Sequence, residues 1–341
     1  MSIPTALTGK RLLAARLFWP MAGLALLLVF NLFFTTNFYH LEIREGHLYG
    51  TLTDILNRGS QGMILALGMT LVIATGGVDL SVGSMMAVSG VIGALLVTDA
   101  HLPFPLVVAL ALLGTLAAGL WNGMLVAYFR IQPIVATLIL MVAGRGIALL
   151  FTDGQIITFT DKSLVYFGNG YLLGIPFTMT IVAVVFLTLA LLTRKTALGL
   201  FIESTGDNET ASRFCGLNVQ AIKLLAYGFS GICAGVAGLI AASNIKAADS
   251  SRVGENMELD AIFAVVVGGT ALTGGRFTLV GSIIGAILIQ TLTHTMYGLG
   301  VPAAVAPVPK AVVVVAVCLL QSETFRTKVQ RVFGRVPATS A

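Results

Sequence analysis

The residues whose chemistry could support catalysis are few and dispersed. The sequence contains neither a Gly-x-x-x-x-Gly-Lys-Ser/Thr phosphate loop nor a His-Glu-x-x-His zinc motif, and it has no nucleophile elbow. The three cysteines lie in two apolar runs and one basic loop, a distribution typical of core thiols rather than of a disulfide framework. The four histidines are too far apart to suggest a metal site: His40, His47, His101 and His294. The sequence therefore predicts a chain that is not an enzyme and that holds no metal or cofactor of its own.

One long polar segment could bind a soluble partner. Residues 194–220, RKTALGLFIESTGDNETASRFCGLNVQ, carry both charge signs and contain a predicted short helix over 209–214. Asp207 or Asn208 is a suitable N-cap for this helix, and Gly216 suits the position that follows its end. A short capped helix between two membrane spans can fit into the surface of a partner protein. The alternative is an ordinary solvated connection between spans.

Two glycine-rich turns share one pattern. The sequence ATGGVDLSVGS matches VVGGTALTGGR at a constant offset of 192 residues, and the same offset aligns a second block, Ile-Gly-Ala. The fixed offset predicts an internal repeat of two halves, which is common in transporters; chance similarity between glycine-rich membrane sequences is the alternative. In the first turn we expect Asp79 to cap the following helix, with a ligand role as the alternative. The glycines expected to shape the turns are Gly76, Gly77, Gly83, Gly268, Gly269 and Gly275.

Several residues inside or beside apolar runs are candidates for a translocation pathway. Trp121 and Asn122 are adjacent, and an aromatic face beside an amide suits a sugar ring; a hydrogen bond between helices explains the amide equally well. Arg145 lies within an apolar run, where a charge costs about 2.5–3.5 kcal/mol, so it should face protein or water unless its side chain extends to the membrane surface. The predicted pathway residues are Asp79, Trp121, Asn122, Gln132 and Arg145.

The elements that carry these residues must lie in a membrane. Of the 341 residues, 57% are hydrophobic and 10% are charged, whereas soluble domains have about 45–50% and about 25%. The mean hydropathy of +0.94 agrees, and no segment is polar enough to form a separate soluble domain. The net charge of +5 is spread over short connections rather than gathered in a patch, so nucleic acid is not an expected partner.

The apolar runs predict an all-α, polytopic membrane protein with about ten transmembrane helices. None of the runs alternates between apolar and polar residues, which argues against a membrane barrel. The runs lie near residues 17–35, 61–75, 84–98, 105–128, 134–151, 173–193, 221–242, 258–270, 279–297 and 304–321.

The distribution of lysine and arginine predicts the orientation. With the N-terminus in the cytoplasm and the spans alternating, thirteen of the twenty basic residues lie on the cytoplasmic side, while the acidic residues concentrate on the other side. The basic start of the chain is similar to a signal sequence, but no cleavage site follows its long apolar run, so we expect it to remain as the first span. The predicted parts are a cytoplasmic tail over residues 1–16, a single membrane domain over 17–321 with its main cytoplasmic loop over 194–220, and a cytoplasmic tail over 322–341.

Three sequence blocks resemble a known family. They are GMTLVIATGGVDLSVGS, RIQPIVATLILMVAGRG and MELDAIFAVVVGGTALTGGRFTLVGSIIGA. Together they resemble the permeases of bacterial ATP-binding-cassette (ABC) sugar importers, in the group that transports ribose, xylose, arabinose and galactofuranose. The similarity extends from about residue 50 to about residue 320. Within the group, ILNRGSQGMILALGMTLVIATGGVDLSVG and LLTRKTALGLFIES are most similar to the galactofuranose permeases.

The resemblance implies a non-catalytic half of a transport pathway. A second permease subunit would complete the pathway; it is a related chain or a second copy of this one, and the galactofuranose branch implies an unlike pair. A periplasmic binding protein would deliver the sugar, and a separate cytoplasmic ATPase, which binds the ATP and Mg, would drive alternating access. The expected location is the bacterial inner membrane.

The resemblance also implies that the polar segment 194–220 contacts the ATPase. The family pattern Gly-x-Asn…Ala-Ala-Arg…Gly matches this segment, with Ser212 at the second small position. Asp207 departs from the family by adding a negative charge where the partner surface is not expected to need one. The residues carried over to this coupling role are Asp207, Asn208, Ala211, Arg213 and Gly216.

The main alternative function is an ion-coupled secondary transporter of a small polar solute. Such a protein would need carboxylates in the middle of its spans. Here each acidic residue falls at the end of a predicted span or in a loop, with Asp260 nearest to the membrane. A membrane-embedded enzyme would need a catalytic constellation that the sequence lacks, and the duplicated halves argue against a subunit that only anchors a partner.

Overall fold

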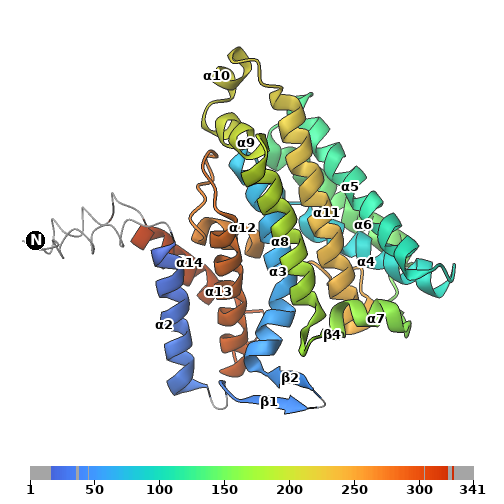
Figure 1. Cartoon of the computed structure of the whole chain (residues 1–341). Coiled ribbons are helices and arrows are strands. Elements are labelled where there is room, and N and C mark those ends of the chain that lie inside the picture. Colours follow the sequence, from blue (N-terminus) through green and yellow to red (C-terminus); the bar gives the residue numbers. More distant parts are fainter. Residues whose placement is uncertain (1–16, 36–37, 45, 303, 322–324, 326–341) are drawn as a thin grey trace, which may run out of the picture.

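The computed structural model describes residues 17–35, 38–44, 46–302, 304–321 and 325. The predicted tails over 1–16 and 322–341 therefore lie outside the described residues, apart from Phe325. The described part forms a bundle of helices with short strands at one end and two small helices at the other (Figure 1).

Ten helices overlap the ten predicted apolar runs. They are α2 (Phe18–Phe34), α3 (Thr51–Ala74), α4 (Val82–Thr98), α5 (Phe104–Ala127), α6 (Pro133–Phe151), α8 (Phe177–Lys195), α11 (Val219–Ile245), α12 (Met257–Val267), α13 (Leu279–Gly298) and α14 (Pro307–Gln321). Five of these, α5, α6, α8, α11 and α13, are long and apolar enough to cross a membrane, whereas α2, α4 and most of α14 are apolar but shorter. The protein is therefore mainly helical and has several apolar helices that can span a membrane, while the count of ten spans stays a prediction.

Helix α3 begins well before the predicted start of its span at residue 61. Its first turns, TLTDILNRGS, contain polar residues, but Thr53, Ile55 and Gly59 are buried against the rest of the bundle. Asp54 lies in the first turn, where a negative charge interacts favourably with the helix dipole. A search for apolar runs misses this part because its buried face is narrow and interrupted by polar residues.

The connections between the long helices contain further short helices and strands, while the protein remains mainly helical as predicted. The additional helices are α7 (Lys162–Asn169), α9 (Leu198–Asp207) and α10 (Glu209–Phe214). Within the described ranges, six short strands pair antiparallel into three two-stranded sheets. The pairs are β1 (Leu41–Arg44) with β2 (His47–Gly50), β3 (Ile157–Thr158) with β6 (Ala247–Ala248), and β4 (Tyr171–Leu172) with β5 (Ile175–Pro176). These strands satisfy main-chain groups where the chain turns back between helices.

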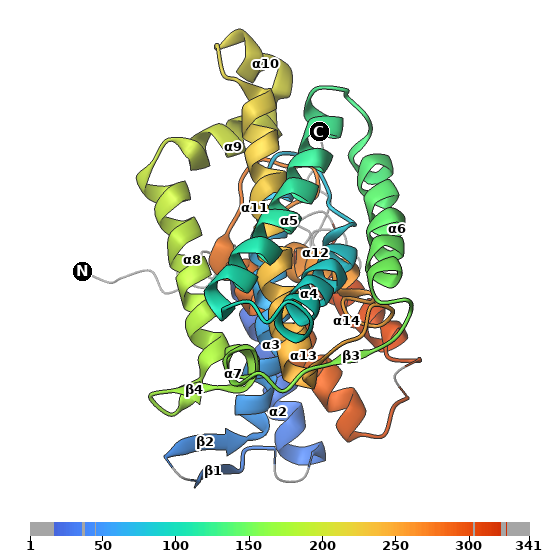
Figure 2. The same cartoon turned by 90° about the vertical axis from the view of Figure 1, so that its right-hand side faces the viewer.

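Helix α11 forms the centre of the bundle and packs against α3, α4 and α5 (Figures 1 and 2). Gly231 lies against the main chain of Thr115 and Gly119 in α5, and Gly238 lies against the main chain of Met86 in α4. Small residues at such contacts let the backbones of membrane helices approach closely. Within their most apolar windows, α11 is 78% buried, whereas α5, α6 and α8 are each 22% buried. These outer helices therefore present a large apolar surface outside the bundle.

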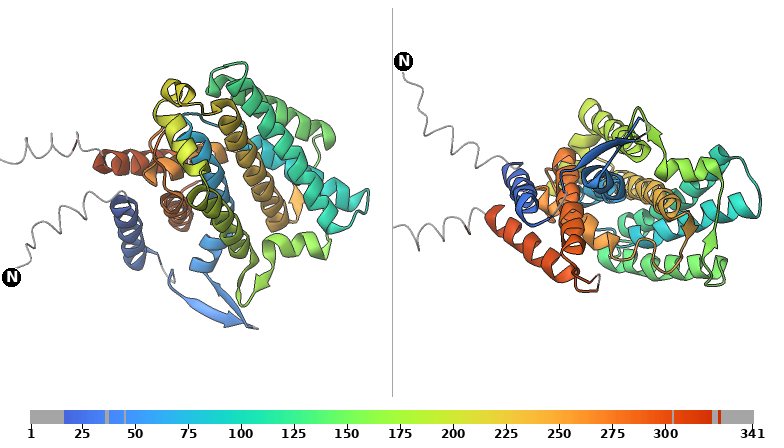
Figure 3. Two further views of the ribbon diagram at one scale, coloured as in Figure 1. Left: turned by 45° about the horizontal axis from the view of Figure 1, so that its top comes forward. Right: turned by 90° about the horizontal axis from the view of Figure 1, so that it is seen from below.

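Helices α2, α13 and α14 lie together at one side of the bundle (Figure 3). The buried Asn31 side chain of α2 donates to the Thr295 hydroxyl of α13 (2.8 Å). In α14, the Lys310 ammonium pairs with the Asp260 carboxylate of α12 (2.7 Å). Polar contacts of this kind satisfy groups that would be costly to leave unpaired in a membrane.

Helices α4 and α12 both begin inside the bundle rather than at its ends. The Ser84 hydroxyl, in the first turn of α4, donates to the carbonyl of Leu140 near the middle of α6 (3.2 Å). Gly83 contacts the main chain of Gly254 and the carboxylate of Glu258 at the start of α12. The sequence alone does not predict this contact between Gly83 and Gly254. The segments that precede α4 and α12 enter the bundle from opposite ends and meet, because neither glycine has a side chain to keep them apart.

Candidate functional site

The polar segment between α8 and α11 forms two short helices at one end of the bundle (Figures 1 and 2). The Asn208 side chain caps α10 by accepting a hydrogen bond from the Ala211 amide (2.9 Å). Gly216 follows the helix end at Cys215 and has a φ of 82°. The predicted short helix over 209–214, its cap and its stop are therefore confirmed. Helix α9 was not predicted, because the sequence LGLFIESTGD offers neither an N-cap nor a clear apolar period.

Helix α10 is held to both of its neighbours. The Glu209 carboxylate pairs with the Lys223 ammonium of α11 (2.6 Å) and with the Arg213 guanidinium one turn away. The Ser212 hydroxyl donates to the carbonyl of Ser204 in α9 (2.8 Å). Partial burial raises the pKa of Glu209, but the hydrogen bonds and positive charges of Lys223 and Arg213 outweigh burial, so the pKa lies below its ordinary value of 4.5. We call α9 and α10 together the coupling segment.

The two glycine-rich turns meet next to the C-terminal end of α9, in the middle of the coupling segment. The Gly275 amide, in the second turn, donates to the Ala74 carbonyl that ends α3 and leads into the first turn (2.9 Å). Gly206 of α9 lies directly against both of these groups, so a methyl group at this position would overlap the Ala74 oxygen and the Gly275 nitrogen. Three segments distant in the sequence thus converge here, and their contact depends on a residue without a side chain.

Asp79 lies at the bottom of the first turn and is completely buried. Its carboxylate accepts hydrogen bonds from the Ser81 amide (3.1 Å), the Ser81 hydroxyl (2.6 Å) and the Ser230 hydroxyl of α11 (2.8 Å). The Asn122 amide of α5 donates to the Ser81 hydroxyl (2.8 Å) and also reaches the Asp79 carboxylate (3.5 Å). We call these four residues the Asp79 cluster. The prediction that Asp79 caps α4 is wrong. Ser81 is the residue that directly precedes the helix, and the Asp79 carboxylate accepts hydrogen bonds from the Ser81 amide and hydroxyl rather than from the first turn of α4.

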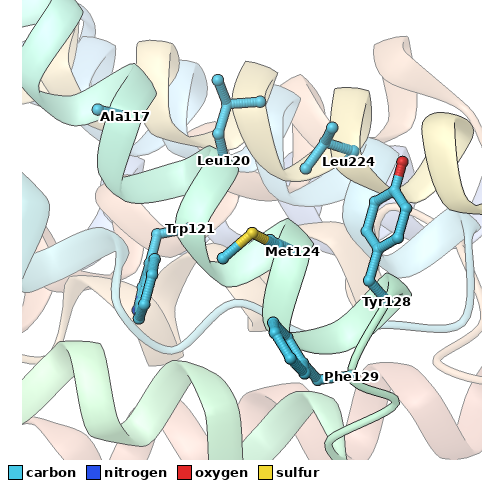
Figure 4. A pocket seen from close by; sticks show the side chains of 7 residues that line it. All are labelled: Ala117, Leu120, Trp121, Met124, Tyr128, Phe129 and Leu224. Carbon is cyan, nitrogen blue, oxygen red and sulfur yellow. The ribbon is translucent and has the colours of Figure 1, made fainter.

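Trp121 and Asn122 point to different sides of α5. Asn122 is buried in the Asp79 cluster, whereas the Trp121 side chain is half-exposed. Trp121 lines an apolar groove of about 530 Å³ together with Met124, Tyr128 and Phe129, which project from α5 and the residues after it (Figure 4). The two side chains therefore do not form the aromatic–amide pair that was predicted, since adjacent positions on a helix do not share a face.

Arg145 lies within α6, and Gln132 lies just before the helix begins. One guanidinium nitrogen of Arg145 donates to the carbonyls of Ser250 (2.9 Å) and Val253 (2.7 Å), in the segment that enters the bundle before α12. Arg145 therefore satisfies main-chain groups inside the protein rather than extending to the membrane surface. Gln132 is exposed and immediately precedes α6. Nothing in these positions tests a role in the pathway, which stays a prediction for all five residues.

Glu258 is a buried acidic residue that sequence reasoning placed at the edge of the membrane. Only 6% of it is exposed, and its carboxylate lies against Gly83. No sequence signal could have found this contact, because it depends on two segments that enter the bundle. Among the described residues, no group of three or more potential ligands could hold a metal ion.

The comparisons with known proteins agree with the resemblance seen in the sequence. Residues 51–320 match the family described as the branched-chain amino acid transport system permease component. The chain is 45% identical to the galactofuranose transporter permease protein YtfT of Escherichia coli K12 over 98% of each chain. It is 40% identical to the fructose import permease protein FruF of Bifidobacterium longum, over 92% of this chain and 89% of that protein.

A third relative, the ribose import permease protein RbsC of Escherichia coli K12, is 38% identical over 80% of this chain and 85% of its own length. No solved structure matches the chain. All three relatives are named as permease proteins, in agreement with the prediction that this chain is a non-catalytic subunit. Because the family match covers most of the chain and the similarity extends over nearly the full length of a relative, this protein belongs to the family of permease components of ABC transport systems.

Proposed function

We propose that this chain forms the membrane pathway for a monosaccharide in an ABC importer. The solute is galactofuranose or a similar furanose or pentose sugar, delivered by a periplasmic binding protein. The observation that carries the proposal is the 45% identity with a galactofuranose permease over 98% of both chains. The family description names branched-chain amino acids, but the three relatives described above are named for sugars. The pattern of similarity therefore favours a sugar.

The proposed topology has ten spans in the bacterial inner membrane, with both termini in the cytoplasm. The ten helices that overlap the apolar runs support this count, provided that α4 and α12 each cover only part of the membrane. The coupling segment then lies on the cytoplasmic side. Its surroundings include Arg194, Lys195, Arg213 and Arg276, which fits the excess of basic residues expected there.

The coupling segment is the proposed contact with a cytoplasmic ATPase that binds ATP and Mg. The residues proposed for this contact lie on or beside α10, which carries an almost fully exposed Phe214. They are Asp207, Asn208, Ala211, Arg213 and Gly216. Ion pairs and hydrogen bonds join α10 to α9 and α11, so a force applied to α10 reaches the bundle. A second permease subunit, related to this chain rather than identical with it, completes the pathway, and ATP binding shifts the pair between outward- and inward-facing states.

The proposed internal repeat is supported by the meeting of the two glycine-rich turns. Helices α3 and α12 each end at a turn with the same sequence pattern, and α4 and α13 each follow one. In transporters, sites and moving parts are commonly built where two repeats meet. The turns lie directly beneath Gly206 of the coupling segment, so both repeats are within reach of the same driving subunit.

The experiment is sugar uptake into proteoliposomes that contain this chain together with an ATPase, a second permease and a binding protein of the same transport system. Uptake of a furanose sugar that requires ATP and each added partner is the expected result. Uptake by this chain alone, driven by an ion gradient and indifferent to ATP, would instead establish the ion-coupled secondary transporter. The carboxylates that this alternative would use are the buried Asp79 and Glu258, since Asp260, which the sequence placed nearest to the membrane, already pairs with Lys310.

A further inference from the structure

We propose that the tip of the second glycine-rich turn is a second docking point for the ATPase, beside α10. The tip consists of Ala271, Leu272 and Thr273, between α12 and α13. This inference rests on the proposed function, since it requires the α10 end of the bundle to face the cytoplasm and an ATPase. It adds that the ATPase contacts both the coupling segment and the second repeat.

Hydrogen bonds within the turn and to α3 hold the tip in place. The Thr278 hydroxyl donates to the Gly268 carbonyl (3.2 Å), and the Gly274 amide donates to the Ala271 carbonyl (3.1 Å). The Gly275 amide donates to the Ala74 carbonyl of α3, which fixes the turn to the first repeat. Gly274 and Gly275 have φ values of 91° and 89°, a conformation that side chains other than glycine rarely adopt. The tip is therefore held in one position rather than being a loose loop.

None of the residues that the structure describes covers the tip. Ala271, Leu272 and Thr273 are all exposed, and half of the Leu272 surface is accessible. Of the corresponding residues of the first turn, Asp79 and Ser81 are completely buried and Leu80 is half-buried. A turn with this sequence pattern can therefore be buried, so the exposure of residues 271–273 is a feature of the second turn and not of the pattern. An apolar side chain displayed at the end of a rigid turn needs a protein partner to remove it from water.

The surroundings of the tip indicate which partner this is. The turn extends at the same end of the bundle as α9 and α10 (Figure 1), and Gly275 packs beside Asp207, the last residue of α9. Asp207 and Arg276 are exposed, so charged residues flank the tip and mark it as facing water rather than lipid. Phe214 of α10 is 88% exposed at this same end. Two apolar side chains set among charges fit an aqueous protein surface with apolar depressions, and the ATPase is the subunit already assigned to this end.

Site-directed photo-cross-linking of the assembled transporter distinguishes the two docking points. Cys215, which is exposed beside Phe214, carries a benzophenone maleimide in one sample. A second sample carries the label on Leu272→Cys in a Cys215→Ser, Cys318→Ala background, where the remaining Cys233 is buried. A third carries it on Leu173→Cys in the same background, because Leu173 is 95% exposed in the β4–β5 turn at the opposite end. Adducts with the ATPase are expected from Cys215 and from Leu272→Cys, and not from Leu173→Cys.

The outcomes separate this inference from the function on which it rests. Adducts from Cys215 but not from Leu272→Cys, or adducts of Leu272→Cys with the second permease or with lipid, overturn the second docking point and leave the proposed function intact. No ATPase adduct from either position overturns the proposed function itself. As an independent measurement, Leu272→Ser should weaken binding of the ATPase to the purified permease pair about fivefold. Leu173→Ser should leave it unchanged, and an equal affinity for the two variants would contradict the inference.

Discussion

The two glycine-rich turns have the same sequence pattern and opposite environments. In the first, Asp79 draws the chain into the bundle, where the carboxylate binds Ser81 and Ser230. In the second, Ala271 occupies the corresponding position and stays at the surface. Glycines allow the backbone to bend in both turns. The residue at this one position, Asp79 in the first turn and Ala271 in the second, differs together with how deeply the turn is buried in the bundle. Two turns of one sequence pattern can thus differ in role, one holding the bundle together and the other remaining at the surface, where we propose that it meets a partner.

Removal of the Asp79 carboxylate should produce the largest effect and would erase the difference between the turns. In Asp79→Leu the donors of Ser81 and Ser230 lose their acceptor while they remain buried, so we expect a loss of more than about 3 kcal/mol in stability. Thermal unfolding of the detergent-solubilised protein measures this loss. Asp79→Asn is the matched control, because its amide oxygen can still accept from Ser81 and its amide nitrogen can donate to Ser230. If both variants unfold alike, hydrogen bonding is not what holds the first turn inside.

A methyl group at Gly206 should separate the coupling segment from both turns. Gly206→Ala places a carbon atom against Ala74 and Gly275, and overpacking of this kind costs about 1–3 kcal/mol. We expect ATP-driven uptake to fall more than the amount of folded protein does. Gly62→Ala in α3 is the control, since nothing lies within 4 Å of its position and its effect should be small. Equal uptake by the two variants would show that the contact of Gly206 with the turns does not transmit force.

An acidic residue in the second turn tests whether the sequence pattern or its environment decides burial. Ala271→Asp restores the residue type of the first turn at an exposed position, so stability should change by less than about 0.5 kcal/mol. The added charge should remain accessible, which a carboxyl-directed modification reagent would detect by mass spectrometry. A strongly destabilised or inaccessible Asp at this position would mean that the second turn can also be drawn into the bundle.

The features that the sequence predicted correctly are those set by local composition. Apolar runs located ten helices, and the order Asn208, Glu209 and Gly216 located a short helix with its cap and stop, because capping depends on neighbours in the chain. The position of Gly83 against Glu258 was not predictable, since it depends on two segments that enter the bundle from opposite ends. The direction of Trp121 was equally hidden, because one apolar helix face cannot be told from another when lipid replaces water as the surroundings.

The smallest expected effect lies in the coupling segment, outside both turns. The pKa of Glu209 is below 4.5, since Lys223 and Arg213 favour its charged form. A carboxyl with a lowered pKa in the folded state stabilises that state above its ordinary pKa, and this contribution disappears as the pH falls through the folded value.

Amide hydrogen exchange between pH 7 and pH 3.5, corrected for the intrinsic rate, should therefore reveal a loss of protection in α10 at the acidic end. In Glu209→Gln the protection should be lower at pH 7 and nearly independent of pH. The two glycine-rich turns contain no residue of this ion-pair network and should keep their protection in both proteins. If the turns lose protection together with α10, the coupling segment and the turns unfold as one unit. The contact through Gly206 would then be stronger than the ion pairs that hold α10 itself.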